Sequence, residues 1–331
     1  MHNLALTILV IAVALFFDFT NGFHDTANAI ATSVSTHALS PRAAVILSAA
    51  MNFVGAFVTT KVAATIGGGV IPAAQTTLIM VLAAVMGAIT WNLITWYQGL
   101  PSSSTHALVG GLIGVGIVAI GFGGVKWASV IGKIVVPLVI SPILGFIVSY
   151  IGMLLIYWLF RGTRPRAVNG GFRFAQIFSA AFVSFSHGTN DSQKTMGIIT
   201  LALVTQGYLS RFAVPVWVIA AAACAMAFGT YAGGWRIIRT MGTRLYKISP
   251  AEGFDAQLVA AIIIQGAAQF GLPVSTTHVV TGAVLGAGTT DNPSAVRWGV
   301  GINIVTAWIL TIPAAAVVAG VLYFLVHFIA R

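Results

Sequence analysis

Long apolar runs, interrupted at a few points by polar residues, make up most of the chain. The first covers residues 4–36, which is too long for one straight crossing, because about 20 helical residues span the ~30 Å hydrocarbon core of a membrane. Asp18 interrupts it once, and the polar stretch from Asn21 to Asp25 predicts a break in the helix. The pattern therefore predicts an all-α, polytopic membrane protein.

Further apolar runs follow, separated by short connections. They cover residues 43–60, 76–97, 107–120, 127–160, 174–205, 212–232, 257–269, 279–288 and 298–328, and Gly67-Gly68-Gly69 is expected to form a loop. The short runs at 107–120 and 279–288 follow proline-containing turns, so each is expected to belong to a membrane hairpin that dips in without crossing. We expect the run at 174–205 to be a broken helix, and Pro137 and Pro142 to break the run at 127–160. About ten to twelve membrane segments result.

Two polar motifs each occur twice. Gly22-Phe23-His24-Asp25-Thr26-Ala27-Asn28 returns as Gly188-Thr189-Asn190-Asp191-Ser192-Gln193-Lys194, which places the two aspartates 166 positions apart. Pro101-Ser102-Ser103-Ser104-Thr105-His106 returns as Pro273-Val274-Ser275-Thr276-Thr277-His278, with the two histidines 172 positions apart. The chain is therefore expected to contain two repeats, residues 1–160 and 174–331, joined by a basic connection at residues 161–173.

Composition and charge agree with a membrane protein. Of the 331 residues, 58% are hydrophobic and 7% are charged, whereas a soluble domain carries about a quarter charged residues. The basic residues lie in short connections, so the net charge of +10 indicates orientation in the bilayer and not binding to nucleic acid. If residues 161–173 are cytoplasmic, counting crossings places both termini outside the cell membrane. Each half then crosses an odd number of times, so the repeats are inverted, as in secondary transporters. The single cysteine, Cys224, is expected to be a buried structural thiol.

Three acidic residues lie within apolar runs, where an ionised carboxylate is costly and by default functional. Asp25 and Asp191 are equivalent in the repeat, whereas Asp18 corresponds to Ser184 and has no twin. Whether Asp18 is functional or only pairs with a neighbour stays open. The residues beside the equivalent pair coordinate hard cations through oxygen or bind oxyanions through N–H and O–H groups. They are Asn21, Thr26, Asn28, Thr189, Asn190 and Ser192.

The second motif suits an anion. A helix that begins at Ser103–Thr105 or at Ser275–Thr277 presents free N–H groups, hydroxyls and the positive end of its dipole. Two such tips that enter from opposite sides could surround a tetrahedral oxyanion. His106 and His278 follow directly, and either a structural role or contact with substrate or proton fits them. Two carboxylates and a doubly charged anion need compensating charge. Lys194 supplies one positive charge, and bound cations or protons must supply the rest, which would couple symport.

The duplicated stretches resemble the hallmark motifs of the inorganic phosphate transporter (PiT) family, and the resemblance covers nearly the whole chain. It implies a transporter and not an enzyme, with inverted repeats, two membrane hairpins, a homodimer and no cofactor beyond the coupling ion. Inorganic phosphate would bind between the tips and the broken helices. By position, the cation ligands would be Asp25, Asn28, Asn190 and Asp191. The phosphate ligands would be Ser103, Ser104, Thr105, Ser275, Thr276 and Thr277.

The chain departs from the sodium-coupled pattern, which has Asn-Asp and a later Asn in both copies. Here His24 precedes Asp25, and Lys194 occupies the position of Asn28. Because a fixed ammonium would displace sodium, we predict H+ coupling, as in the bacterial low-affinity branch, with a neutral metal–phosphate complex as one form of the substrate. The alternatives are Na+ coupling and a sulfate permease, whose substrate is also tetrahedral. An intramembrane aspartyl protease would also need two aspartates, but it leaves the hydroxyl-rich tips without a purpose.

Overall fold

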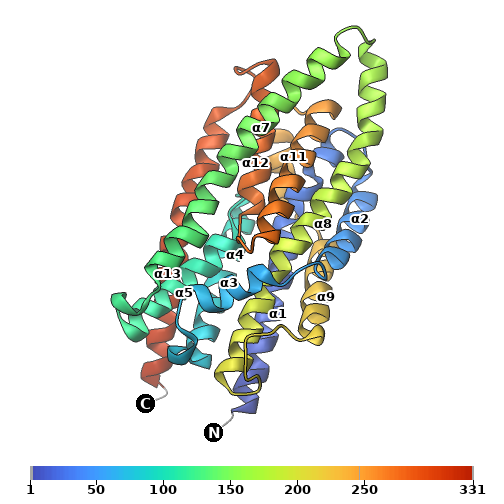
Figure 1. The fold of residues 1–331 in the computed structure, drawn as a ribbon. Helices are drawn as coiled ribbons and strands as arrows, with labels where there is room; N and C mark the ends of the chain where they lie inside the picture. The colour runs from blue at the N-terminus through green and yellow to red at the C-terminus, as the bar shows by residue number, and fades with distance from the viewer. Residues whose placement is uncertain (1–2, 246, 330–331) are drawn as a thin grey trace.

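The computed structural model describes residues 3–245 and 247–329, without the side chains of Thr26, Thr243, Arg244, Phe328 and Ile329. This part of the chain is helical and contains no strand (Figure 1). The longer helices are α1 (Leu4–Ser35), α2 (Pro41–Gly55), α3 (Lys61–Gly69), α4 (Leu78–Gln98), α5 (Ser104–Ile120), α7 (Val136–Phe160), α8 (Pro165–Thr205), α9 (Val216–Ala232), α11 (Pro250–Gln269), α12 (Thr276–Asp291) and α13 (Trp298–Ile329). Short elements are α6 (Trp127–Ser129), α10 (Trp235–Arg239), the 3-10 turns η1 (Ala73–Gln75) and η2 (Phe122–Gly124), and the π segments η3 (Val130–Val135) and η4 (Thr240–Arg244).

The predicted breaks in the two motif-bearing helices were wrong. Helix α1 runs for 32 residues through the first motif, and α8 runs for 41 residues through the second. The polar side chains of the motifs bond to neighbouring helices, so the helical backbone need not open to satisfy them. Gly22 and Gly188 are tolerated inside these helices because the neighbouring backbone lies directly against them: an added Cβ would meet Met226 O at 2.5 Å and Asn52 O at 2.2 Å, respectively.

Three connections also differ from the expectation. The basic connection at residues 161–173 is mostly helical, because Pro165 opens α8 after a short turn and suits the first helical position. Gly67-Gly68-Gly69 ends α3 and does not form a loop. The run from Trp127 to Phe160 stays helical, with the π segment η3 in place of a break. Since Pro137 has no N–H to bond in the ordinary helical ladder, the preceding turns widen.

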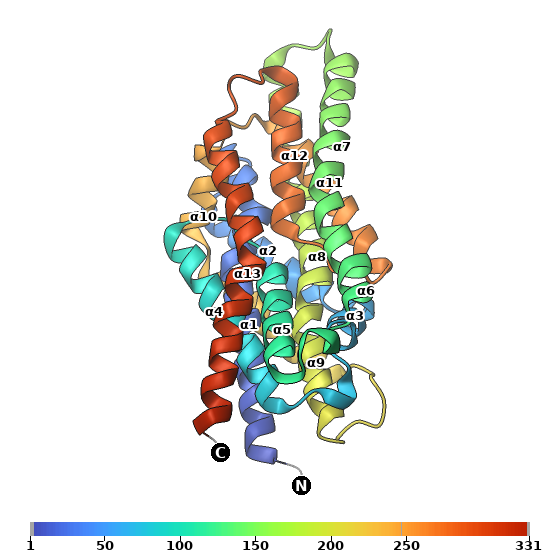
Figure 2. The ribbon, with the colours of Figure 1, turned by 90° about the vertical axis from the view of Figure 1, so that its left-hand side faces the viewer.

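Helix packing follows the same plan in both halves. Helix α5 packs on α4 and α13, and α12 packs on α11 and α7. Helix α1 packs on α9, α8 packs on α2, and α1 and α8 contact each other at the centre. Exchanging each element for its counterpart in the other half therefore reproduces the contacts. Figures 1 and 2 show both chain ends at one end of the molecule and the α7–α8 turn at the other.

Paired glycines bring α5 and α12 close to their neighbours. A Cβ on Gly114 of α5 would lie 2.0 Å from Ala316 O of α13, and one on Gly286 of α12 would lie 2.2 Å from Phe146 O of α7. Gly110 and Gly282, one turn earlier, meet Ile312 O and Pro142 O in the same way. Small residues four apart let membrane helices approach at backbone distance. Helices α5 and α12 are therefore held by equivalent contacts.

The protein is an integral membrane protein with several apolar helices. Among the described residues, four helical stretches are long and apolar enough to cross a membrane: Leu4–Ser35, Leu78–Gln98, Trp127–Phe160 and Trp298–His327. A fifth results if α9 and the following residues to Gly242, bent by 58°, count as one span. The expected ten to twelve segments remain a prediction, since α8 and α12 carry polar motifs and several helices are short. Cys224 is exposed, so its expected burial was wrong.

The glycine contacts predict a stability difference. We expect Gly114→Ala and Gly286→Ala each to lower the free energy of unfolding by about 1–3 kcal/mol, because the added methyl group collides with backbone. Gly266→Ala is the matched control, since an added Cβ there meets no atom within 4 Å. Thermal unfolding of the detergent-purified protein measures the difference. Equal melting temperatures for the three variants would contradict the close-packing interpretation.

Candidate functional site

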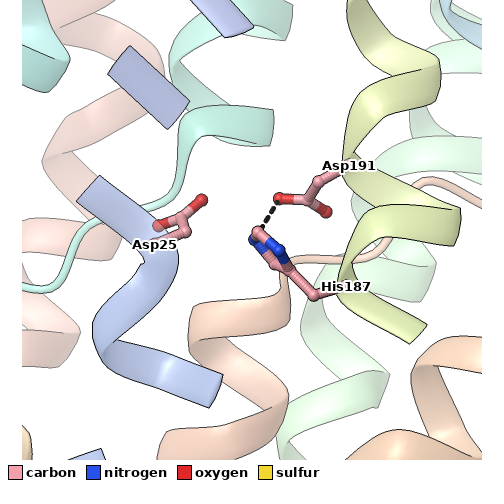
Figure 3. Close-up of side chains that lie close together, drawn as sticks. All are labelled: Asp25, His187 and Asp191. Atoms are coloured by element: carbon pink, nitrogen blue, oxygen red, sulfur yellow. Dashed lines mark ion pairs between the residues drawn. The ribbon is translucent and has the colours of Figure 1, made fainter. Parts of the chain in front are cut away.

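The two equivalent aspartates lie together where α1 crosses α8. Figure 3 shows Asp25 of α1 facing Asp191 and His187 of α8. One ligand atom from each of the three residues lies within 4.8 Å of the others, and all three side chains are buried. The structure thus joins residues 166 positions apart in one polar cluster inside apolar surroundings.

Asp25 receives hydrogen bonds from both tips. Ser104 Oγ, at the start of α5, donates to Asp25 Oδ2 at 2.7 Å, and Thr277 Oγ1, at the start of α12, donates to Oδ1 at 3.1 Å. His24 Nδ1 lies 2.9 Å from the same Oδ1. Because an ionised carboxylate only accepts, Nδ1 carries a proton in this pairing. Elements from both halves therefore converge on one carboxylate.

His24 is held from its other side by hydroxyls. Its Nε2 lies 3.2 Å from Thr95 Oγ1 and 3.3 Å from Ser102 Oγ, and these two hydroxyls are 2.7 Å apart. A hydroxyl can donate or accept. His24 can therefore keep these partners whether Nε2 is protonated or not, which suits a group that exchanges a proton.

Asp191 is paired with a buried ammonium. Lys194 Nζ lies 2.7 Å from Asp191 Oδ2 and donates to Ser104 Oγ at 3.2 Å, so it links α8 to the first tip. Thr276 Oγ1 donates to the same Oδ2 at 3.4 Å, and His187 Nε2 lies 3.3 Å from it. Each equivalent aspartate thus has a basic partner and a hydroxyl from the second tip.

The asparagines of the first motif complete the polar surface of α1. Asn21 Oδ1 lies 2.6 Å from Ser104 Oγ and competes with Asp25 for its single hydroxyl proton, and Asn28 Nδ2 donates to Thr277 Oγ1 at 2.8 Å. Asn21, Asp25 and Asn28 lie four and three residues apart, so they share one helix face. This face of α1 contacts both tips, through Ser104 and Thr277.

The six predicted phosphate ligands of the tips divide into two groups. Ser103 and Ser275 cap α5 and α12 by accepting from the N–H groups of His106 and His278 at 3.2 and 3.3 Å. Thr105 Oγ1 donates to Val274 O at 3.3 Å, which joins one tip to the other. The remaining three, Ser104, Thr276 and Thr277, bond to the aspartates. The first group shapes the tips, and the second reaches the charged cluster.

Other predicted residues lie at the margin of the cluster. His106 and His278 contact each other at 4.5 Å between ring centres and line a cavity of about 330 Å³ between α7 and α13, which no aspartate lines. Asn190 Nδ2 donates to Leu272 O at 3.4 Å. The Ser192 hydroxyl is buried without a hydrogen-bond partner in the described part of the chain. The predicted Thr26 side chain lies outside the described residues.

Sequence reasoning missed His187. Its Nδ1 lies 2.9 Å from Asn52 Oδ1 of α2, and Asn52 Nδ2 donates to Thr230 Oγ1 of α9 at 2.9 Å. The signal was present, because His187 lies 166 positions after Asn21 and so belongs to the repeat. Two carboxylates and an imidazole are ligands for a divalent cation. The Lys194 ammonium beside Asp191 opposes such a resident ion, so a metal is a poor fit here.

Comparison with known proteins shows which family the chain resembles. A sequence model described as the phosphate transporter family matches residues 21–319. Probable low-affinity inorganic phosphate transporters are 51% identical in Mycobacterium bovis, over 99% of this chain and 79% of that one, and 48% identical in Rhizobium meliloti, over 99% of both. A Bacillus subtilis protein of the same description is 46% identical over 98% of both chains. A solved structure titled "The sodium-dependent phosphate transporter" has a TM-score of 0.92 and 26% identity, and the match covers 98% of this chain and 100% of that one.

The buried ion pair predicts a stability effect. Removing one partner of such a pair costs about 3–5 kcal/mol, because the other charge is left uncompensated. We therefore expect Lys194→Met to lower the melting temperature of the purified protein clearly, and the double variant Lys194→Met/Asp191→Asn to regain most of the loss. Lys133→Met, at an exposed position, is the control. A double variant as unstable as Lys194→Met alone would contradict the pairing.

Proposed function

The chain belongs to the phosphate transporter family, and we propose that it carries inorganic phosphate across the cell membrane as a proton-coupled symporter. It is a phosphate transporter and not an enzyme. The homologues named above carry the same description along nearly the whole length of this chain. The coupling ion, the roles of individual residues and the membrane arrangement are the proposed part.

One observation carries the proposal: the donors that suit phosphate are bonded to carboxylates. Ser104 and Thr277 donate to Asp25, and Lys194 donates to Asp191. Hydroxyls and an ammonium are also the groups that bind phosphate oxygens. Phosphate and the two carboxylates therefore compete for the same donors, and their negative charges repel in a low dielectric.

Protonation resolves this competition. A proton on Asp25 or Asp191 removes a negative charge and weakens the hold of that carboxylate on its donors, which become available to phosphate. Proton and phosphate binding then favour each other, and this linkage is reciprocal. His24 is suited to deliver the proton to Asp25, since its Nδ1 lies 2.9 Å from Asp25 Oδ1 and its Nε2 faces hydroxyls.

Residue roles follow from these contacts and from the resemblance. Phosphate would be bound by Ser103, Ser104, Thr105, Ser275, Thr276, Thr277 and Lys194, with Ser103 and Ser275 holding the two helix N-termini in place. Coupling would involve Asp25, Asn28, Asn190, Asp191 and His24. The position of Lys194 supports coupling to protons and not to sodium, because a sodium ion at Asp191 would lie beside an ammonium that is 2.7 Å from this carboxylate.

Alternating access between two inverted repeats is the proposed transport motion. The chain ends and the α7–α8 turn at opposite ends of the molecule, and the exchangeable helix contacts of the halves, support it (Figures 1 and 2). The α4–α5 and α11–α12 pairs would be the membrane hairpins. The four arginines at residues 161–173 support a cytoplasmic α7–α8 turn, with both termini outside. A homodimer remains a prediction from the resemblance.

Uptake of labelled phosphate into proteoliposomes tests the coupling. We expect an inward proton gradient to drive accumulation without sodium, and a protonophore to abolish it. Asp25→Asn and Asp191→Asn should each reduce this uptake strongly, because each removes a titrating group of the site. Asp291→Asn, an exposed acid at the end of α12, is the control. Uptake that requires sodium and ignores the protonophore would refute proton coupling.

The role of Lys194 gives a second test. Lys194→Asn restores at the second motif the residue found in the first motif, and it removes the ammonium that opposes a cation. We expect this variant to lose proton-driven uptake and to bind phosphate more tightly as sodium is raised, measured by the sodium dependence of phosphate binding. No response to sodium would count against the view that the ammonium occupies a cation position.

A further inference from the structure

Asp18 lies on the same face of α1 as the site but belongs to neither duplicated motif. It precedes Asn21 by three residues and Asp25 by seven, and these offsets lie on one stripe of a helix. Ala14, one turn earlier, lies on the same stripe, and its carbonyl is 3.5 Å from Thr195 Oγ1 of α8. The stripe therefore faces α8 along its whole length, with Asp18 about 10 Å from Asp25 towards the chain ends.

Asp18 is fully buried and poorly partnered. Its side chain has 0% exposure, and neither carboxylate oxygen has a hydrogen bond of ordinary geometry among the described residues. Asn21 and Thr195 are nearby polar groups. An ionised carboxylate buried without such bonds is costly, whereas a protonated one is neutral. Burial therefore favours the neutral, protonated form of Asp18.

The charges around Asp18 come from one helix. Lys194 and Asp191, both on α8, are the charged groups that act on it. Helices α4 and α9, which also pack on α1, contain no Asp, Glu, Lys, Arg or His. The start of α10 and helix α11 contact α1 at Phe23 and Ala29, which follow Asp18 by five and eleven residues. The electrostatic interaction between Asp18 and the site therefore acts chiefly through the Lys194 ammonium.

We propose that Asp18 is a second proton-binding site, which controls the position of the Lys194 ammonium during transport. This inference rests on the proposed proton coupling. With Asp18 neutral, Lys194 bonds to Asp191 and Ser104, as observed. When Asp18 loses its proton, its carboxylate attracts the same ammonium away from the phosphate-binding tip. In each cycle Asp18 binds one proton from one side of the membrane and releases it to the other, and no covalent bond other than this O–H bond changes.

The location of Asp18 fits this role. Asp18 lies nearer than Asp25 to the start of α1, and Figure 1 shows that the chain enters α1 at the end of the molecule that holds both termini. With the termini outside, a proton that enters from outside meets Asp18 before it meets Asp25. Release of phosphate on the inner side would then be accompanied by loss of the proton from Asp18, which withdraws Lys194 from the tip.

Two transport assays on Asp18→Asn test the proposal. One measures accumulation of labelled phosphate under a proton gradient, and the other measures exchange of labelled for unlabelled phosphate at equal pH. With one proton at the aspartate pair, a second at Asp18 and no membrane potential, one pH unit sustains about hundredfold accumulation, since 1.4 kcal/mol corresponds to a factor of ten for each proton. We expect Asp18→Asn to lower accumulation to about tenfold while exchange falls much less, and Asp18→Glu to restore accumulation.

Asp255→Asn is the matched control. Asp255 is also a buried acid, but it accepts a hydrogen bond from Ser149 and lies outside the site, so accumulation and exchange should both persist. Full accumulation by Asp18→Asn would overturn the proposal. So would equal loss of accumulation and exchange that Asp18→Glu does not restore, because this indicates a structural role. If the wild type itself does not respond to a proton gradient, the proposed function fails instead.

Discussion

A carboxylate inside a membrane protein is stable only if the protein supplies donors or positive charge for it, and the fold is arranged to do so for Asp25 and Asp191. Donors converge on them from α1, α5, α8 and α12, so the two tips are positioned by the charges they satisfy. Breaking any of these contacts leaves a buried charge without compensation in a low-dielectric environment. Under the proposed mechanism, a transport step replaces each lost partner with a proton or with substrate.

Close backbone approach makes this convergence possible. Gly22 lies against Met226 of α9 and Gly188 against Asn52 of α2, so the motif glycines let a neighbouring helix pack closely against each motif-bearing helix. The glycine pairs of α5 and α12 do the same for the tips against α13 and α7. In lipid, where hydrophobic burial does not drive association between helices, such contacts and interhelical hydrogen bonds supply the packing energy. The donors can reach the buried aspartates only because the glycine contacts bring the helices close together.

The sequence predicted the chemistry of the site better than its backbone. Duplicated acids in apolar runs are rare enough to be recognised, and Asp25 and Asp191 do lie together. Polar residues within a helix, however, look the same whether they interrupt the backbone or bond across to a neighbour. Only the tertiary contacts of Ser104 and Thr277 distinguish these cases, so the helix breaks were predicted wrongly. The capping roles of Ser103 and Ser275 follow from their positions just before a helix. Which tip hydroxyls bond to the aspartates, as Ser104 and Thr277 do, depends on which side of the tip faces the acids.

The two halves share their packing but differ in charge. Asp18 stands where the second half has Ser184, which adds one negative charge to the first half, and Lys194 stands where the first half has Asn28, which adds one positive charge to the second. Because α1 and α8 face each other, the two differences act on one site, and their sum is zero when both groups are ionised. Lys194 is compensated by Asp191, whereas the charge on Asp18 depends on whether it holds a proton. Under the proposed coupling, this asymmetry gives the two halves different affinities for a proton.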